Sequence, residues 1–162
     1  MMTTEPILKT SSETGPDTDS LLLIVVGAHL IAELADRPTA YQLAQQIVDW
    51  QKEHLDCGEP WLSPIVCSDM WYLNSSQLMA RPTICLGRPG VNAASAYFAN
   101  RLPSAFVVEQ SFQVQLDIEF IDMQACIWGI DASSTSSAIE MFKTRYLDSF
   151  LRAAHNLPAQ PA

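Results

Sequence analysis

The stretch Pro82-Thr83-Ile84-Cys85-Leu86-Gly87-Arg88-Pro89-Gly90-Val91-Asn92-Ala93-Ala94-Ser95-Ala96 joins a short apolar segment to a segment rich in small residues. Residues 82–86 predict a buried strand, and Pro89 and Gly90 are typical of a tight turn. Asn92 is a good N-cap for a helix that we expect over residues 91–102. This strand–turn–helix unit indicates an α/β fold.

Similar units precede this stretch. Residues 21–26 form a continuous apolar run, which is typical of a strand covered on both faces of a sheet. We expect a loop over residues 28–37 and then a helix over 39–55, where apolar residues recur at helical spacing. A strand over 63–68 and a short helical turn over 74–80 complete the first half.

The second half has a different pattern. Residues 112–120 alternate strictly between apolar and polar side chains, which predicts a strand with one face in solvent. Residues 105–109 are either a separate strand or the beginning of the same one. Another strand, over residues 124–130, follows a tight turn and therefore predicts an antiparallel hairpin. The chain then forms an amphipathic helix that we expect over 135–155.

This order of elements predicts a three-layer α/β/α sandwich. Its sheet is mostly parallel but mixed, with five or six strands, a C-terminal antiparallel hairpin and a long C-terminal helix. We expect a single α/β domain over residues 20–156. The polar composition of residues 1–19 predicts a disordered N-terminal tail, and the prolines near the other end predict a flexible tail over 157–162.

The composition argues against two classes of partner. The chain of 162 residues carries a net charge of −9, and an acidic surface repels the phosphates of nucleic acids. The apolar run at 21–26 is too short to cross a bilayer, so we expect no membrane association. The 48% hydrophobic content suits a homo-oligomer.

The cysteines bear on the compartment. None of them shows the C-x-x-C spacing of a metal or redox site; they are Cys57, Cys67, Cys85 and Cys126. Three lie in predicted strands, where small buried residues are expected. Together with the absence of a secretory leader in the first 20 residues, reduced thiols favour a cytoplasmic location.

The predicted topology locates a candidate site. In α/β sheets, ligands bind beyond the carboxyl ends of the parallel strands. His29 follows the first predicted strand, Asp69 the second and the turn over residues 87–92 the third. If these strands are neighbours, the three loops share one rim. We expect His29, Asp69, Arg88 and Asn92 to converge there.

The turn after the third strand suggests a small anionic ligand. Gly87 and Gly90 would let the backbone approach a bound molecule, while the helix that begins near Asn92 attracts negative charge. Arg88 could contact a phosphate or a carboxylate through two N–H groups. We therefore expect ligand binding by Gly87, Arg88, Gly90 and Asn92. The same residues are equally explained as ordinary turn and cap residues.

Evidence for catalysis is weak. His29 could act as a general base oriented by Asp69, although an isolated histidine in an apolar loop is more often packed in the core. Ser68 or Cys67 would be the nucleophile, but neither lies in a G-x-S-x-G context. The three histidines lie in separate segments and show no metal-ligand spacing.

No motif specifies a reaction or a cofactor. The leading hypothesis is a protein that binds a small anionic molecule at the rim of the sheet. The alternative is a non-catalytic subunit that forms oligomers or binds other proteins. Trp71 and Tyr72 would either stack on a planar ligand or pack over the end of the sheet. The solvent-facing side of strand 112–120 and the aromatic stripe of the last helix would serve the alternative.

Overall fold

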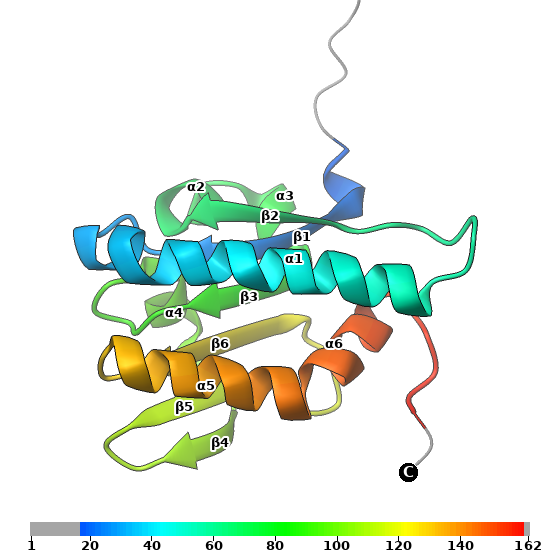
Figure 1. The fold of residues 1–162 in the computed structure, drawn as a ribbon. Helices are drawn as coiled ribbons and strands as arrows, with labels where there is room; N and C mark the ends of the chain where they lie inside the picture. The colour runs from blue at the N-terminus through cyan, green and yellow to red at the C-terminus, as the bar shows by residue number, and fades with distance from the viewer. Residues whose placement is uncertain (1–16, 161–162) are drawn as a thin grey trace, which may run out of the picture.

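Six strands form one mixed sheet in the order β2-β1-β3-β6-β5-β4 (Figure 1). The computed structural model describes residues 17–160. The strands are β1 (Leu21–Val26), β2 (Ser63–Ser68), β3 (Thr83–Leu86), β4 (Ser104–Val108), β5 (Phe112–Leu116) and β6 (Gln124–Gly129). Strands β2, β1, β3 and β6 are parallel, and β5 is antiparallel to both β6 and β4. The predicted mixed sheet with a C-terminal hairpin is confirmed.

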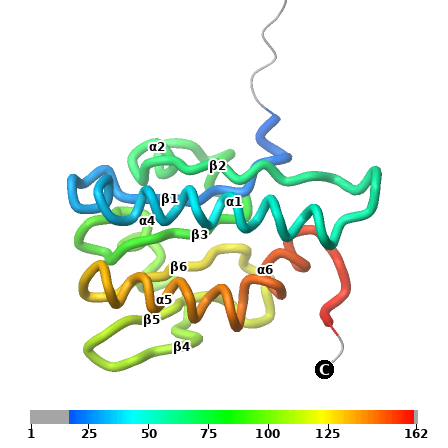
Figure 2. Tube along the Cα trace, in the orientation of Figure 1, coloured from blue at the N-terminus to red at the C-terminus, as the bar shows by residue number. Residues whose placement is uncertain are grey.

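Helices cover both faces of this sheet. They are η1 (Thr18–Ser20), η2 (Ala32–Asp36), α1 (Arg37–His54), α2 (Asp69–Leu73), α3 (Ser76–Met79), α4 (Ala93–Phe98), α5 (Ala132–Arg145) and α6 (Leu147–Ala154). Figure 2 shows α1 and α5 crossing the same face in roughly the same direction. One core cluster joins that face to α1, α5 and α6, and a second joins the opposite face to α2, α3 and α4. The predicted sandwich architecture is thus confirmed.

The position of β1 between two layers of helices explains why its sequence is apolar without interruption. Leu22, Ile24 and Val26 belong to the cluster under α1 and α5. The alternating residues Leu21, Leu23 and Val25 belong to the cluster on the other face. All six side chains are buried, as expected for a strand between two layers of helices.

The loop predicted over residues 28–37 is partly helical. The π-helical segment η2 runs directly into α1, and the Arg37 N–H donates to the Ala32 carbonyl. Pro38 has no N–H, so the regular i→i−4 pattern fails there. The wider π turn keeps the helix continuous through that position.

The strand predicted over residues 112–120 ends at Leu116. The Asp117 carboxylate accepts hydrogen bonds from the N–H groups of Glu119, Ile121 and Asp122, and this closes the chain into a turn. The expected solvent-facing side was also wrong at Gln115. This side chain is buried and donates hydrogen bonds to the carbonyls at the end of the α4 segment.

The ends of the chain differ from the prediction in detail. The long C-terminal helix is present as α5, and it starts at Ala132 and breaks at Tyr146 before α6. Residues 1–16 of the predicted N-terminal tail, and 161–162 of the C-terminal one, lie outside the described residues. Among residues 17–160, no helix has the length and apolar character that a membrane span requires.

Candidate functional site

Two side chains fasten together the loops that follow β1, β2 and β3. Asp69 accepts hydrogen bonds from the N–H of Ala28 at 3.1 Å and from the N–H of Ala93 at 2.7 Å. The buried Asn92 amide donates to the carbonyls of Val25 and Leu86. The three loops therefore meet at one edge, but the predicted convergence was wrong for Arg88, which does not join His29, Asp69 and Asn92 there.

These bonds occupy the donors that the sequence suggested for a ligand. Asn92 Oδ1 accepts from the N–H groups of Ala94 and Ser95. Together with the bond from Ala93 to Asp69, three N–H groups at the beginning of α4 have partners. Asp69 and Asn92 thus stabilise the loop junction, while the beginning of α4 offers few free donors.

His29 and Gly90 border an open depression beside this junction, together with Asp69 and Asn92. His29 is exposed rather than packed in the core, and its Nδ1 accepts a hydrogen bond from the Ile31 N–H. No hydrogen bond joins His29 to Asp69 among residues 17–160, and both Asp69 oxygens bind backbone N–H groups. The pair that we considered for catalysis is therefore not assembled.

The other catalytic candidates have structural partners. Ser68 caps α2 by accepting from the Trp71 N–H. Burial raises the pKa of the Cys67 thiol to about 11, so its thiolate is scarce at neutral pH. Tyr72 is fully buried and donates to Thr83, whereas Trp71 is exposed. Within residues 17–160, no group of three potential metal-binding side chains occurs.

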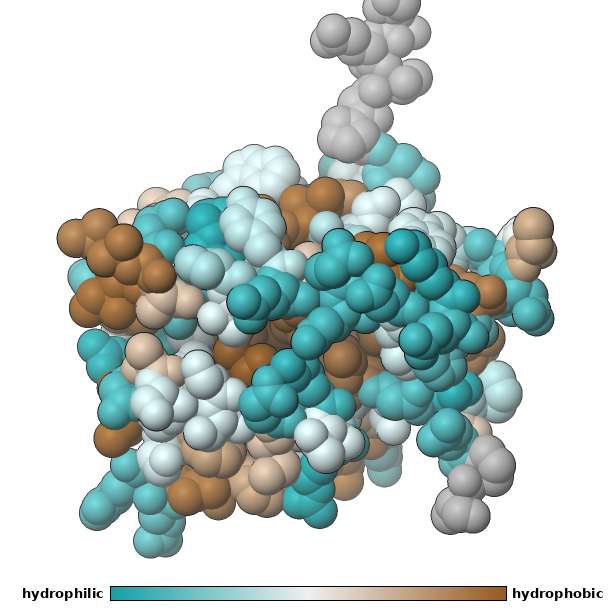
Figure 3. Space-filling view, viewed as in Figure 1, coloured by the Kyte–Doolittle hydropathy of each residue, from teal (hydrophilic) through white to brown (hydrophobic). Residues whose placement is uncertain are grey.

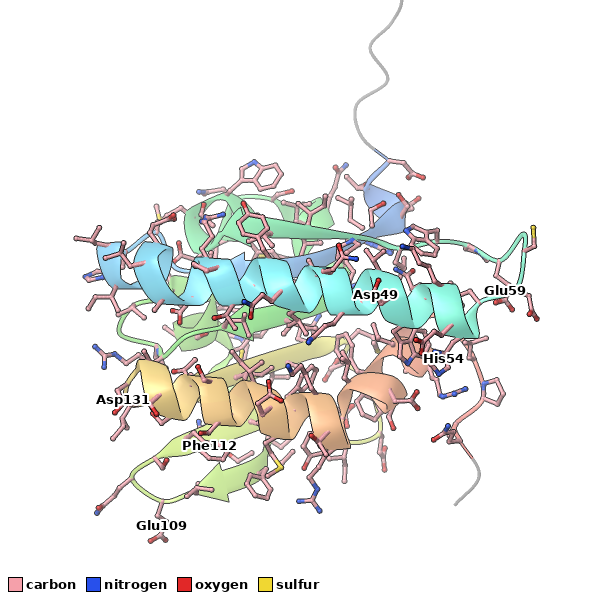
Figure 4. The ribbon with its side chains drawn as sticks, in the orientation of Figure 1. Asp49, His54, Glu59, Glu109, Phe112 and Asp131 are labelled. Carbon is pink, nitrogen blue, oxygen red and sulfur yellow. The ribbon has the colours of Figure 1, made fainter. Side chains whose placement is uncertain are left out.

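Arg88 belongs to a different part of the edge from Asn92. Its Nη1 donates to the Ile130 carbonyl at 2.7 Å, just beyond the end of β6. There it borders a small cavity of about 40 Å³ between the ends of β3 and β6, the η2 segment and the first turn of α5. Asp131, the N-cap of α5, marks the same corner of the molecule (Figure 4).

Asp36 is the notable side chain of this cavity. It is the last residue of η2, only 7% of it is exposed, and it borders the cavity together with Gly87 and Arg88. No group in residues 17–160 donates a hydrogen bond to its carboxyl, and no ion pair within 4.0 Å forms with Arg88. The carboxyl oxygens keep some solvent access through the cavity, since they are not among the fully buried side-chain atoms without a partner.

Burial without a partner changes the acidity of Asp36. Desolvation raises the pKa of this carboxyl from 3.8 to about 6, and the positive charge of Arg88 opposes the rise. Asp131 borders the cavity at the beginning of α5. Glu33 of η2 and Arg37 of α1 pair with each other at 2.9 Å. Asp36 therefore changes its protonation state in the physiological range.

Gly87 makes room for this carboxyl. Its φ of +106° lies in the region that side chains disfavour. A Cβ at this position would also lie 2.7 Å from Asp36 Oδ2. Glycine at the end of β3 is thus required both by the backbone turn and by the position of Asp36.

Sequence reasoning placed Gly87 and Arg88 at the site but missed Asp36. In the sequence this residue reads as the entry to a helix, before Pro38. The available signal was that Asp36 lies one helical turn after the apolar residue Ala32, and only the structure shows that both residues are buried. Comparison with protein-family models, curated proteins and solved structures finds no match for this chain.

Proposed function

We propose that the protein binds a small anionic molecule in the cavity between the ends of β3 and β6. One observation carries this proposal: the buried Asp36 carboxyl lacks a protein partner and faces a cavity that Arg88 also borders. An acidic group placed between them would accept hydrogen bonds from the Arg88 guanidinium and from protonated Asp36. It would thereby supply the partner that Asp36 lacks and use donors of Arg88 that the Ile130 carbonyl leaves free.

Arg88 is the cationic side chain of the cavity lining, which also includes the carboxyl groups of Asp36 and Asp131, so an anion fits only when Asp36 is protonated. Arg88 uses one N–H on the Ile130 carbonyl and has further donors in its guanidinium. Asp131 also borders the cavity, but its carboxylate accepts from the N–H and hydroxyl of Ser134. The cavity volume of about 40 Å³ accommodates a group of only a few heavy atoms, since a water needs roughly 10–15 Å³ by the same measure.

Acetate is the simplest probe of this proposal. We expect a titration with acetate at pH 5.5, followed by ¹⁵N–¹H NMR, to shift the amide signals of Gly87, Arg88 and Ile130 in a saturable way. Replacing Arg88 by Gln removes the charge but keeps a polar side chain. This variant should weaken acetate binding at least tenfold, because charge-assisted hydrogen bonds contribute about 1.5–3 kcal/mol.

Arg101→Gln is the matched control. Arg101 is exposed and stacks on the Tyr97 ring, away from the cavity, so its loss should leave the acetate titration unchanged. The proposal would be overturned if acetate caused no saturable shifts at the cavity. It would also be overturned if Arg88→Gln and Arg101→Gln had equal effects.

A second candidate function is assembly with another copy of the chain. Strand β4 is an edge of the sheet, and its Val107 and Val108 are 51% and 39% exposed. It carries no charged residue that would block edge-to-edge pairing. Light scattering at micromolar concentration tests this candidate, and a monomer throughout would exclude it.

We further propose a cytoplasmic location, which the free thiols of all four cysteines support.

A further inference from the structure

Exposed apolar side chains lie at the mouth of the Asp36 cavity and beside it in the chain. We call them the apolar rim: Leu30, Ile31, Leu34 and Ile130, which are 70%, 51%, 72% and 53% exposed. Ile31 and Ile130 border the cavity itself, and Leu34 lies one turn along the helix from Ile31. Figure 3 shows a hydrophobic cluster at the end of the molecule where the chain enters α1.

This rim is unlike the rest of that helix surface. Residues of α1 beyond Pro38 expose mainly polar side chains, whereas the turns before it expose large aliphatic ones. Contiguous exposed apolar residues beside a cavity commonly mark a binding surface. The cavity holds only a few heavy atoms, so any larger ligand has to extend over the rim.

We propose that the natural ligand is a monomeric amphiphile, with a carboxylate head in the Asp36 cavity and an aliphatic chain on the apolar rim. The assignment rests on the proposed function, because the cavity must first accept the head group. The rim borders the cavity directly at Ile31 and Ile130, so head and chain are contiguous in one molecule. A membrane surface suits the site less well, since the chain carries a net charge of −9.

A series of straight-chain carboxylates tests this assignment. Acetate, butyrate, hexanoate and octanoate, each below its micellar concentration, share one head group and differ only in apolar length. We expect the affinity to rise about two- to fourfold for each added methylene that lies on the rim, as partial to full burial predicts. Calorimetry or the same NMR titration gives each dissociation constant.

Rim variants separate the chain from the head. Leu34→Ser should flatten the gain with chain length, while acetate binding stays within twofold of the wild-type value. Ile118→Ser is the matched control, because Ile118 is 67% exposed in the turn between β5 and the beginning of β6, at the other end of the strands from the cavity. Both substitutions are at exposed positions, so they leave the fold intact, which circular dichroism checks.

The outcomes distinguish this inference from the proposed function. If acetate binds in an Arg88-dependent way but longer chains bind no tighter, the ligand is a small polar anion and the amphiphile assignment fails. If acetate does not bind at all, both proposals fail. Sedimentation with phosphatidylglycerol vesicles should leave the protein in the supernatant. Co-sedimentation that Leu34→Ser abolishes would instead identify the rim as a membrane contact and overturn the assignment.

Discussion

At the scale of single residues, Asp36 and Asn92 show two ways of burying a polar side chain. Asn92 satisfies its amide completely, with donors to two carbonyls and an acceptor for two N–H groups. Asp36 has no such bonds within residues 17–160 and changes its acidity instead. A residue like Asn92 stabilises the native structure, whereas one like Asp36 destabilises it and is open to a ligand.

The raised pKa of Asp36 predicts how its replacement alters stability. The folded protein holds the proton more tightly than the unfolded chain, so the stability falls as pH rises from about 4 through about 6. Asn cannot ionise, so Asp36→Asn should stabilise the protein at pH 7.5 by on the order of 2 kcal/mol and hardly at all at pH 4. Urea unfolding at both pH values measures this difference. An equal effect at both would contradict the assigned acidity.

The sequence predicted which residues form the turn and the helix caps, but it predicted their contacts only in part. Glycine, proline and asparagine predict turns and helix starts, because their backbone preferences depend on neighbouring residues alone. Whether Arg88 faces Asn92 or Asp36 depends on contacts with residues far away in the chain. The burial of Asp36 likewise arises only when Gly87 is placed beneath it.

At the scale of elements, the connection from β6 to α5 forms one wall of the site. A Cβ at Gly129 would lie 2.3 Å from Ser134 Oγ and 2.5 Å from the Thr135 nitrogen. The Gly129 N–H also donates to Thr135 Oγ1. The strand end and the first turn of α5 are thus packed without room for a side chain.

Replacing Gly129 by Ala should therefore displace the beginning of α5 and destabilise the protein by about 2 kcal/mol or more. Gly90→Ala is the control, because the nearest atom to its Cβ would be Arg88 Nε at 3.9 Å. Thermal unfolding of both variants gives the comparison. Similar melting temperatures for the two would show that the close packing at Gly129 is not required.

The sequence predicted the existence of the elements better than their ends. Apolar periodicity reports burial along a whole segment, so β1, α1 and α5 were located from it. Ends depend on single residues: Pro38 is bridged by a π turn, Asp117 closes a turn inside an alternating pattern, and Tyr146 breaks the last helix. Alternation alone does not show where a strand stops pairing.

At the scale of the whole molecule, the direction of each connection determines the geometry of the site. The loop after β1 leads to α1 on one face of the sheet, and the loop after β3 leads to α4 on the other. The Asn92 junction therefore lies on the side of α4, and the Arg88 cavity lies on the side of α1 and α5. The two sites are separate although Arg88 and Asn92 are close in sequence.

The architecture followed from the order of strands and helices, since alternating units favour parallel pairing with helices on both faces. The position of β6 beside β3 was not predicted. β6 follows the hairpin of β4 and β5 in the chain, yet it pairs with β3 in the middle of the sheet. No local sequence pattern encodes this pairing. For this reason the sequence could locate the edge that carries the site but not the wall formed by α5.

If Asp36 and Arg88 together bind an anion, the affinity for acetate depends on pH. Protonated Asp36 donates to the anion while ionised Asp36 repels it. The dissociation constant should therefore rise about 25-fold between pH 5.5 and 7.5, across the pKa of about 6. In Asp36→Asn it should stay constant within twofold. A wild-type constant that did not change with pH, or that fell as pH rose, would show that Asp36 takes no part in binding the anion.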